Sequence, residues 1–277
     1  MKVELFGVRG SMPTPGSDTY LYGGNTSCTY VTKNNGSALI LDSGTGIAKL
    51  GDYLLEQQSP IYILLTHNHW DHIQGFPFFK PIYQANRDIT IVAGDVEDKG
   101  SQHAILKQMS GSYFPVRHQD LPSNITLNTE LSAQSQFNLN GFSISTAPLN
   151  HPGGGTAYCL IADGAKVAYV TDNELNPPQQ TKTSISEWAA FIEGADLLIH
   201  DAQLIDADLP LKHGWGHSTI DQVAQLAIKA KVKNMVIISH DPSRTDEQLI
   251  EIERYLQTSY GKDVRIECGK EGRVFEF

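Results

Sequence analysis

Residues 66–72 read Thr-His-Asn-His-Trp-Asp-His, so three histidines and one aspartate fall within a single short segment. The segment directly follows residues 61–65, an apolar run typical of a buried strand. Imidazole nitrogens and carboxylates are donors that bind zinc and similar divalent ions. Because side chains at i and i+2 of an extended chain point the same way, His67 and His69 can hold one ion. Asp71 and the last histidine lie beyond the bend and are free to face a second ion.

The alternative interpretation is a solvated loop without any ligand role. Chance clustering explains the segment poorly, because the whole chain contains ten histidines in 277 residues. The apolar run before the segment also argues against a mobile surface tract. We therefore take the segment as the first part of a metal site.

Composition sets limits on the class of protein. At 277 residues and 40% hydrophobic residues, the chain is long enough to bury a sizeable core. Its apolar runs are far shorter than the roughly 20 residues of a membrane-spanning helix, which predicts no membrane association. Glu4 and Arg9 interrupt the N-terminal region where a secretory signal needs an apolar stretch, and we expect a cytoplasmic protein. Cys28, Cys159 and Cys268 are too few and too scattered for a disulfide framework or a cysteine-rich zinc site.

The formal net charge of -10 predicts that the surface repels long polyanions. No cluster of lysine and arginine suited to a phosphate backbone is visible in the sequence. Long nucleic acids are therefore poor candidate partners. A small anionic substrate remains compatible if the site supplies its own positive charge.

The chain is organised as one domain, residues 1–277, without a repeat or a linker. Short strand patterns open it, and residues 125–170 return to strands separated by Asn-Gly and Asp-Gly turn signals. The last third alternates strands with helices, which is α/β character. Two such halves predict two sheets packed face to face between helices, a four-layer αββα sandwich. Residues 73–121 are the least regular part and are predicted to be an insertion that covers the site.

The segment His67-Asn68-His69-Trp70-Asp71-His72 resembles the His-x-His-x-Asp-His motif of the metallo-β-lactamase superfamily at every position. Further matches follow in order along almost the whole chain. His151 opens His-Pro-Gly-Gly-Gly, Asp172 ends Tyr-Val-Thr-Asp, and His240 lies in Ile-Ile-Ser-His-Asp-Pro.

The resemblance implies two divalent metal ions that share one carboxylate, with zinc expected first and manganese or iron as alternatives. It assigns His67, His69, His151 and Asp172 to one ion. It assigns Asp71, His72, Asp172 and His240 to the other. Each of the later ligands follows a strand-like run, so separate strands can deliver them to one edge of a sheet.

The segments Leu-Ile-His-Asp-Ala-Gln at 198–203 and Gly-Trp-Gly-His-Ser-Thr at 214–219 resemble the phosphodiesterase branch, which includes ribonuclease Z. That resemblance implies a hydroxide bridging the two ions as nucleophile, with Asp71 in the catalytic set. His217 is then the general acid that protonates the leaving group, and Asp201 orients it. The alternative for His217 is that it only precedes a helix, for which Ser218 or Thr219 is the N-cap.

The 20 residues between His151 and Asp172 read as a simple hairpin and leave no room for the long tRNA-binding arm of ribonuclease Z. The motifs at 7–16 and 22–28 resemble a bacterial subgroup described as cyclic-nucleotide phosphodiesterases. We therefore expect a phosphodiesterase acting on a small anionic diester such as a cyclic nucleotide. The family resemblance also implies a homodimer. Arg9 and Tyr22 are candidate substrate contacts, with packing roles as the alternative.

Three other functions fit the same pattern. One is hydrolysis of a lactone, thioester or β-lactam by the same nucleophile. Another is a redox protein like the flavodiiron proteins, but these carry a carboxylate where His69 stands. The last is a non-catalytic, metal-stabilised binding module, which need not retain every ligand.

Overall fold

The computed structural model describes residues 1–93 and 104–277, and within them the strands form two sheets of seven. The first sheet has the order β14-β1-β2-β3-β4-β5-β6. Its strands are β1 (Lys2–Gly7), β2 (Cys28–Thr32), β3 (Ala38–Leu41), β4 (Ile61–Leu64), β5 (Asp88–Val92), β6 (Asn124–Asn128) and β14 (Val274–Glu276). The last strand pairs with the first, so both ends of the chain share this sheet.

The second sheet has the order β13-β12-β11-β10-β9-β8-β7. Its strands are β7 (Gln136–Leu139), β8 (Phe142–Pro148), β9 (Thr156–Ala162), β10 (Ala165–Val170), β11 (Leu197–Asp201), β12 (Asn234–Ile238) and β13 (Arg265–Cys268). β9 and β10 pair antiparallel through a tight turn, as the sequence predicts for the segment between His151 and Asp172.

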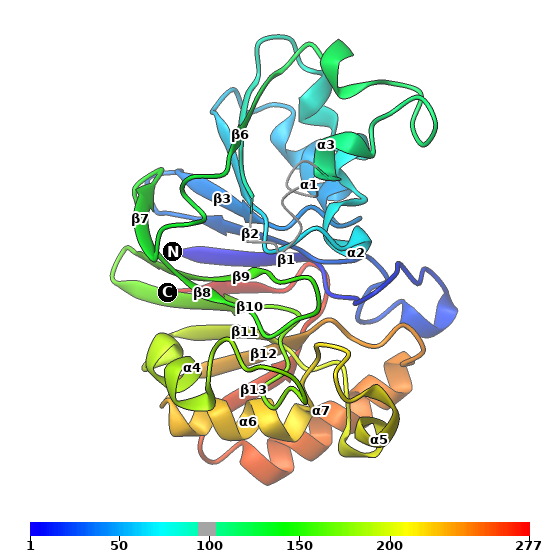
Figure 1. The fold of residues 1–277 in the computed structure, drawn as a ribbon. Helices are drawn as coiled ribbons and strands as arrows, with labels where there is room; N and C mark the ends of the chain where they lie inside the picture. The colour runs from blue at the N-terminus through cyan, green and yellow to red at the C-terminus, as the bar shows by residue number, and fades with distance from the viewer. Residues whose placement is uncertain (94–103) are drawn as a thin grey trace.

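Helices cover the outer face of each sheet (Figure 1). The α-helices are α1 (Ile47–Leu54), α2 (Trp70–Ile73), α3 (Ala104–Lys107), α4 (Ile185–Ile192), α5 (Leu209–Lys212), α6 (Ile220–Lys229) and α7 (Asp246–Tyr260). Short 3-10 helices are η1 (Ser17–Thr19), η2 (Phe76–Phe78), η3 (Lys80–Tyr83), η5 (His118–Asp120) and η6 (Asp206–Asp208). None of the helices in the described part of the chain has the length and hydropathy that a bilayer span requires.

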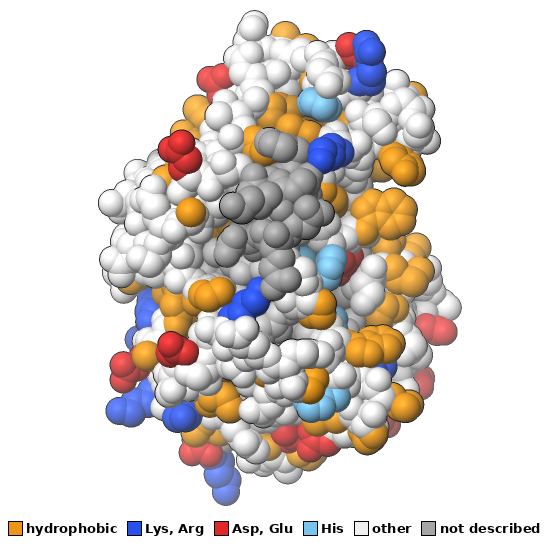
Figure 2. All heavy atoms as spheres, in the orientation of Figure 1, with side chains coloured by type: hydrophobic (Ala, Val, Ile, Leu, Met, Phe, Trp, Pro, Cys, Tyr) orange, Lys and Arg blue, Asp and Glu red, His pale blue; other side chains and the backbone are white. Residues whose placement is uncertain are grey.

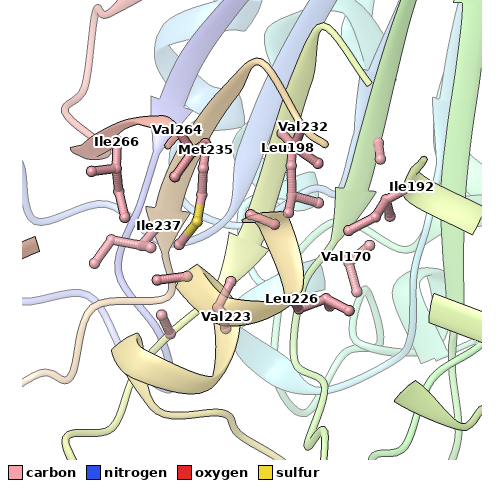
Figure 3. Close-up of a cluster of buried hydrophobic side chains, with 14 of the residues drawn as sticks. Val170, Ile192, Leu198, Val223, Leu226, Val232, Met235, Ile237, Val264 and Ile266 are labelled. Atoms are coloured by element: carbon pink, nitrogen blue, oxygen red, sulfur yellow. The ribbon is translucent and has the colours of Figure 1, made fainter. Parts of the chain in front are cut away.

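Three apolar clusters hold the layers together. One lies between the sheets, a second lies beneath α1, and a third joins the second sheet to α4, α6 and α7 (Figure 3). Strand β10 serves two of them, because Val167 and Tyr169 pack between the sheets while Ala168 and Val170 pack against the helices. Successive side chains of a strand point to opposite faces, so a strand covered on both sides must be apolar throughout. The predicted four-layer αββα sandwich is confirmed.

The predicted insertion at 73–121 needs revision, because it contains β5. This strand pairs in parallel with β4 and β6, and its apolar side chains belong to the core beneath α1. The segment thus contributes an element of the sheet itself. Residues 94–103 of the segment lie outside the described residues, and its role in covering the site stays a prediction.

Parallel pairing places several loops at one edge of the molecule. β3, β4, β5 and β6 run parallel in the first sheet, and β10, β11, β12 and β13 run parallel in the second. The residues that follow the carboxyl ends of parallel strands meet at the same sheet edge. The histidine-rich loop follows β4, Asp172 follows β10, and Asp201 ends β11.

Candidate metal centre

Three groups of ligand atoms converge at this edge, each with its atoms within 4.8 Å of one another. Their members are His67, His69, His151 and Asp172 in the first, Asp71, His72 and Asp172 in the second, and Asp172, Asp201 and His217 in the third. Asp172 belongs to all three groups. It is therefore the centre of the arrangement.

The first group has the spacing of a tetrahedral metal site. His69 Nδ1 lies 2.9 Å from His151 Nε2, and Asp172 Oδ2 lies 3.6 Å from His67 Nε2 and 3.9 Å from His151 Nε2. Ligand atoms about 2.0 Å from a tetrahedral zinc lie roughly 3.3 Å from one another. The buried Nε2 of His67 has no hydrogen-bond partner among the described residues. The donors fit a divalent cation at their centre.

The second group has similar distances. His72 Nε2 lies 3.2 Å from Asp172 Oδ2 and 3.4 Å from Asp71 Oδ2. The backbone N–H of Ser11 donates to Asp71 Oδ2 at 2.7 Å, which holds that carboxylate in place. Burial opposes protonation of His72, but the nearby carboxylates outweigh burial and raise its pKa well above the ordinary value. This excess of negative charge suits a cation.

Four imidazoles are anchored through Nδ1. His72 donates to Asp42 Oδ2 at 2.8 Å, and His151 donates to the Gly216 carbonyl at 3.0 Å. Nδ1 of His67 lies 3.1 Å from Thr66 Oγ1. An anchored Nδ1–H fixes the tautomer and leaves Nε2 as the metal donor, which is the usual outer-shell arrangement of metal-binding histidines.

His217 is the fourth anchored imidazole. Its Nδ1 lies 3.2 Å from Asp201 Oδ1, and the other oxygen of Asp201 accepts the backbone N–H of Ser218. Burial lowers the pKa of His217, but the Asp201 carboxylate outweighs burial and raises that pKa to about 9. The structure therefore brings His217 and Asp201 together beside Asp172, in the same relation as His72 and Asp42.

The loop that carries His217 passes close behind His151. Gly216 has a φ of 88°, in the left-handed region that favours glycine. A Cβ at this position would meet His151 Nδ1 at 2.1 Å. Glycine at 216 is thus required for its carbonyl to anchor His151 and for the next residue to reach the cluster.

The structure does not place His240 in any of these three groups of ligand atoms, and its ligand role stays a prediction. Its Nε2 donates to the Gly269 carbonyl at 2.9 Å, and its ring lies edge-on to Tyr22. Burial lowers its pKa to about 3, and the charged groups that act on it are Arg9, Arg244 and Asp246. Ser239, the residue before His240, has a φ of 56°, so the chain bends as it leaves β12. A strand end places a residue at the sheet edge but does not set the direction of its side chain.

Asp172 is held in a strained backbone conformation. Its φ is 52°, close to the 56° of Ser239, in a region that residues other than glycine rarely adopt. The hydroxyls of Thr171 and Ser239 both donate to its Oδ1 at 3.1 Å. These bonds leave Oδ2 facing the histidines. Strain of this kind is concentrated at functional sites.

The comparisons with known proteins agree with this geometry. A family model described as a beta-lactamase superfamily domain matches residues 40–240, which include the histidine-rich segment, His151, Asp172 and His217. The chain belongs to this superfamily. Ribonuclease Z of Halalkalibacterium halodurans is 23% identical over 245 residues, covering 73% of this chain and 76% of that protein. The predicted membership of the phosphodiesterase branch, and with it of the metal-dependent hydrolases, is confirmed.

Solved structures show the same fold. The metallo-beta-lactamase fold protein YhfI from Bacillus subtilis aligns with a TM-score of 0.73 and 17% identity, covering 100% of this chain and 99% of that one. A diphosphatase from the PhnP family aligns with a TM-score of 0.67 and 18% identity, covering 100% of this chain and 97% of that one. Both similarities extend over the entire length of this superfamily member.

The sequence analysis missed the outer residues of the site in this superfamily member. Asp42 is fully buried and accepts hydrogen bonds from Thr66, His72 and Tyr169. A signal for it exists, because Asp42 follows the apolar strand β3 just as Asp172 follows β10. The contact of Ser11 with Asp71 has no such signal, since it depends on where the N-terminal loop crosses the site.

Arg9 is a packing residue and not a substrate contact. Its side chain is fully buried and donates to the backbone carbonyls of Gly23, Asp241 and Arg244. These bonds join the N-terminal loop to the loop after β12. The same connection holds His240, whose backbone N–H donates to the Val8 carbonyl.

Exposed aromatic side chains lie next to two of the candidate ligands in the chain. His69 is the exposed member of its group, Trp70 next to it is 69% exposed, and Trp215 near His217 is 59% exposed. Figure 2 shows histidine and acidic side chains near the position of α2 in Figure 1, with hydrophobic side chains gathered around them. Large apolar side chains left in solvent beside a polar centre are typical of a binding site.

Proposed function

We propose that the protein is a dinuclear zinc phosphodiesterase acting on a small phosphodiester such as a cyclic nucleotide. The observation that carries the proposal is the position of Asp172 between two groups of ligands, which is the arrangement of a carboxylate that bridges two cations. Neutral imidazoles with carboxylates are a donor set that suits zinc, and also manganese or iron. The small substrate and zinc both go beyond the family assignment.

We assign the ligands of the two ions from the anchored imidazoles. One ion would be held by His67, His69, His151 and Asp172. The other ion would be held by Asp71, His72, Asp172 and His217. In this assignment His217 takes the place predicted for His240, because its Nδ1 is anchored by a buried carboxylate in the manner of His72.

Two divalent cations would supply the Lewis acidity that makes water acidic enough to attack a phosphodiester near neutral pH. The residues of the chain would bind these cations, and neighbouring groups orient the ligand side chains. Two cations carry +4 and the ligands Asp71 and Asp172 carry -2, so this inner set has a net charge of +2 and attracts an anion. Ser11 holds Asp71, and the hydroxyls of Thr171 and Ser239 hold Asp172, so that neither carboxylate must reorganise during the reaction.

Two features support a small substrate with an aromatic base. The chain between His151 and Asp172 is the β9–β10 hairpin, without an additional arm. Trp70 and Trp215 are exposed beside metal-ligand candidates, and aromatic faces stack on nucleobases of any sequence. The net charge of -10 further disfavours a long polyanion.

The test combines metal analysis with a substrate panel. We expect two equivalents of zinc per chain and turnover of 2′,3′-cyclic or 3′,5′-cyclic nucleotides and of bis(p-nitrophenyl) phosphate. An Asp172→Asn variant should lose metal and activity together, which assigns the activity to this site. Turnover of a lactone or thioester with no phosphodiester hydrolysed would contradict the phosphodiesterase proposal. Cleavage of a precursor tRNA in preference to every small diester would contradict the small substrate.

The general-acid role of His217 is separated from a ligand role by the leaving group. An imidazole that only protonates the leaving alkoxide is dispensable for bis(p-nitrophenyl) phosphate, whose leaving group needs no proton. An imidazole that holds a cation is needed for both kinds of substrate. We expect loss on both. The homodimer and the cytoplasmic location stay predictions.

A further inference from the structure

A cavity lies at the end of the first sheet opposite to the metal centre. Its volume is about 360 Å³, which is within the range of small-molecule sites. Its wall includes the start of β3 at Ala38, the start of β4 at Ile61, and Arg87 just before β5. The six residue-to-residue steps from Ile61 to His67 place the cavity on the order of 20 Å from the cluster, at roughly 3.3 Å per extended residue. It is separate from the proposed active site.

Arg87 is the unusual residue of this cavity. Arg87 is only 4% exposed. Its buried Nε has no hydrogen-bond partner among the described residues. Its Nη1 donates to the Gln57 carbonyl. No described carboxylate pairs with it, and the one titratable group that acts on its pKa is the Tyr30 hydroxyl, whose own pKa is raised to about 12, so that it is neutral near pH 7. A buried guanidinium without an anion is costly, so proteins pair such a group when they retain it.

The rest of the lining can serve an anion. Polar side chains of Asn35, Ser37, Ser59 and Asn140 surround the opening. The oxygen of the Asn35 amide already accepts the backbone N–H of Ser37, which leaves the NH₂ of that amide for a ligand. Lys33 Nζ donates to the carbonyl of Gly141, next to Asn140, so a second cationic group lies nearby.

The floor of the cavity is apolar. Ile40, Leu54 and Ile61 are buried there beside the Tyr30 ring. A free phosphate ion is much smaller than the cavity and would leave this floor unfilled. A ligand with a phosphate on a small organic body would fill both parts.

We propose that this cavity is a second binding site, for a small phosphate-bearing anion whose oxygens pair with the Arg87 guanidinium. Planar guanidinium groups bind phosphate oxygens through paired N–H donors, which suits a group that is already oriented by the Gln57 carbonyl. The organic body of a phosphate monoester would lie on the apolar floor. The site does not depend on the chemistry of the metal centre.

Calorimetric titration of the metal-loaded protein with glycerol 3-phosphate and with inorganic phosphate tests the proposal. The metal centre also attracts phosphate, so Asp172→Asn serves as the background without that centre. Ser59→Trp fills the mouth of the cavity from an exposed position without touching Arg87, and Gln58→Trp is its matched control outside the lining. Arg87→Gln removes the charge itself.

We expect binding that persists in Asp172→Asn and Gln58→Trp and weakens at least about tenfold in Ser59→Trp and Arg87→Gln, a tenfold change being 1.4 kcal/mol. Tighter binding of glycerol 3-phosphate than of inorganic phosphate would identify the monoester as the ligand class, and the reverse order would identify the free ion. If Arg87→Gln does not fold, Ser59→Trp decides the question. Loss of all binding in Asp172→Asn, or unchanged binding in Ser59→Trp, would overturn the proposal.

Discussion

His217 and His240 lie at the same edge of the second sheet but differ in the groups that their rings contact. Both histidines are buried, at 8% and 2% exposure, and both lie at the carboxyl edge of the second sheet. His217 is anchored by the carboxylate of Asp201, whereas His240 is anchored by the carbonyl of Gly269. The anchor of His217 directs the ring to Asp172, and the anchor of His240 directs the ring to Tyr22. The position of a histidine at a sheet edge is thus a weaker guide to ligand function than the hydrogen bond that anchors one nitrogen of its ring.

The largest expected effect tests the difference between His217 and His240 directly. His217→Gln should bind one metal equivalent where the wild type binds two, while the matched variant His240→Gln should retain both. Turnover in His217→Gln should fall by more than the roughly 10- to 100-fold that loss of an outer-shell partner costs. Metal analysis and kinetics on bis(p-nitrophenyl) phosphate measure both quantities. Loss of a metal in His240→Gln, with His217→Gln intact, would reverse our assignment.

The next effect concerns the anchor itself. Asp201→Asn keeps the shape of the side chain but removes the charge that orients His217. We expect metal affinity to fall about 10- to 100-fold, as for other outer-shell carboxylates. Competition with a chelator of known affinity measures the change. Affinity equal to that of the wild type would show that Asp201 has no part in holding the imidazole.

A third effect follows from the burial of His240. Burial lowers the pKa of His240 to about 3, against 6.5 for the free side chain. As the pH falls below 6.5, His240 therefore takes up a proton in the unfolded chain before it does so in the folded protein. The stability that the neutral ring contributes above pH 6.5 is lost progressively toward pH 3. At pH 5 this single group accounts for roughly 2 kcal/mol, at 1.36 kcal/mol per pH unit.

His240→Gln should accordingly show a weaker decrease of unfolding free energy between pH 7 and pH 5 than the wild type. Denaturant unfolding at several pH values measures the slope. An unchanged slope in His240→Gln would contradict the neutral, buried state of this ring.

The smallest effect separates the proposed metal ligand His217 from α6, the helix that follows it. Thr219 caps α6 by accepting the backbone N–H of Gln222, and Thr245 caps α7 in the same way through Gln248. Each Thr→Ala variant should lose about 1 kcal/mol, which lowers the melting temperature by roughly 2–4 °C. Metal content should not change in either variant, because Asp201 and not the cap holds His217. Loss of metal in Thr219→Ala alone would make the cap part of the site.

The segment from His67 to His72 could be interpreted from sequence because its chemistry is local. The apolar strand before it, the i and i+2 spacing and the rarity of histidine all lie within a few positions. His151 and Asp172 could be placed because each follows a strand-like run and the resemblance supplied their order. Position 240 has the same local pattern, but its side chain lies outside the three groups of ligand atoms, and its ligand role stays a prediction. The bend at Ser239 has no signature in the neighbouring residues that distinguishes it from the bend at Asp172.

The amino-acid sequence by itself determined the αββα layers and the histidine-rich loop, because apolar alternation and donor spacing are properties of contiguous residues. Only the tertiary structure showed that His217 lies beside Asp172 while His240 lies outside the groups of ligand atoms. It also revealed Asp42 behind His72 and the buried Nε of Arg87, which has no partner in the part of the chain that the structure describes. Hydrogen bonds of this kind join residues tens to hundreds of positions apart. Their partners exist only once the sheets have packed, so no local pattern can record them.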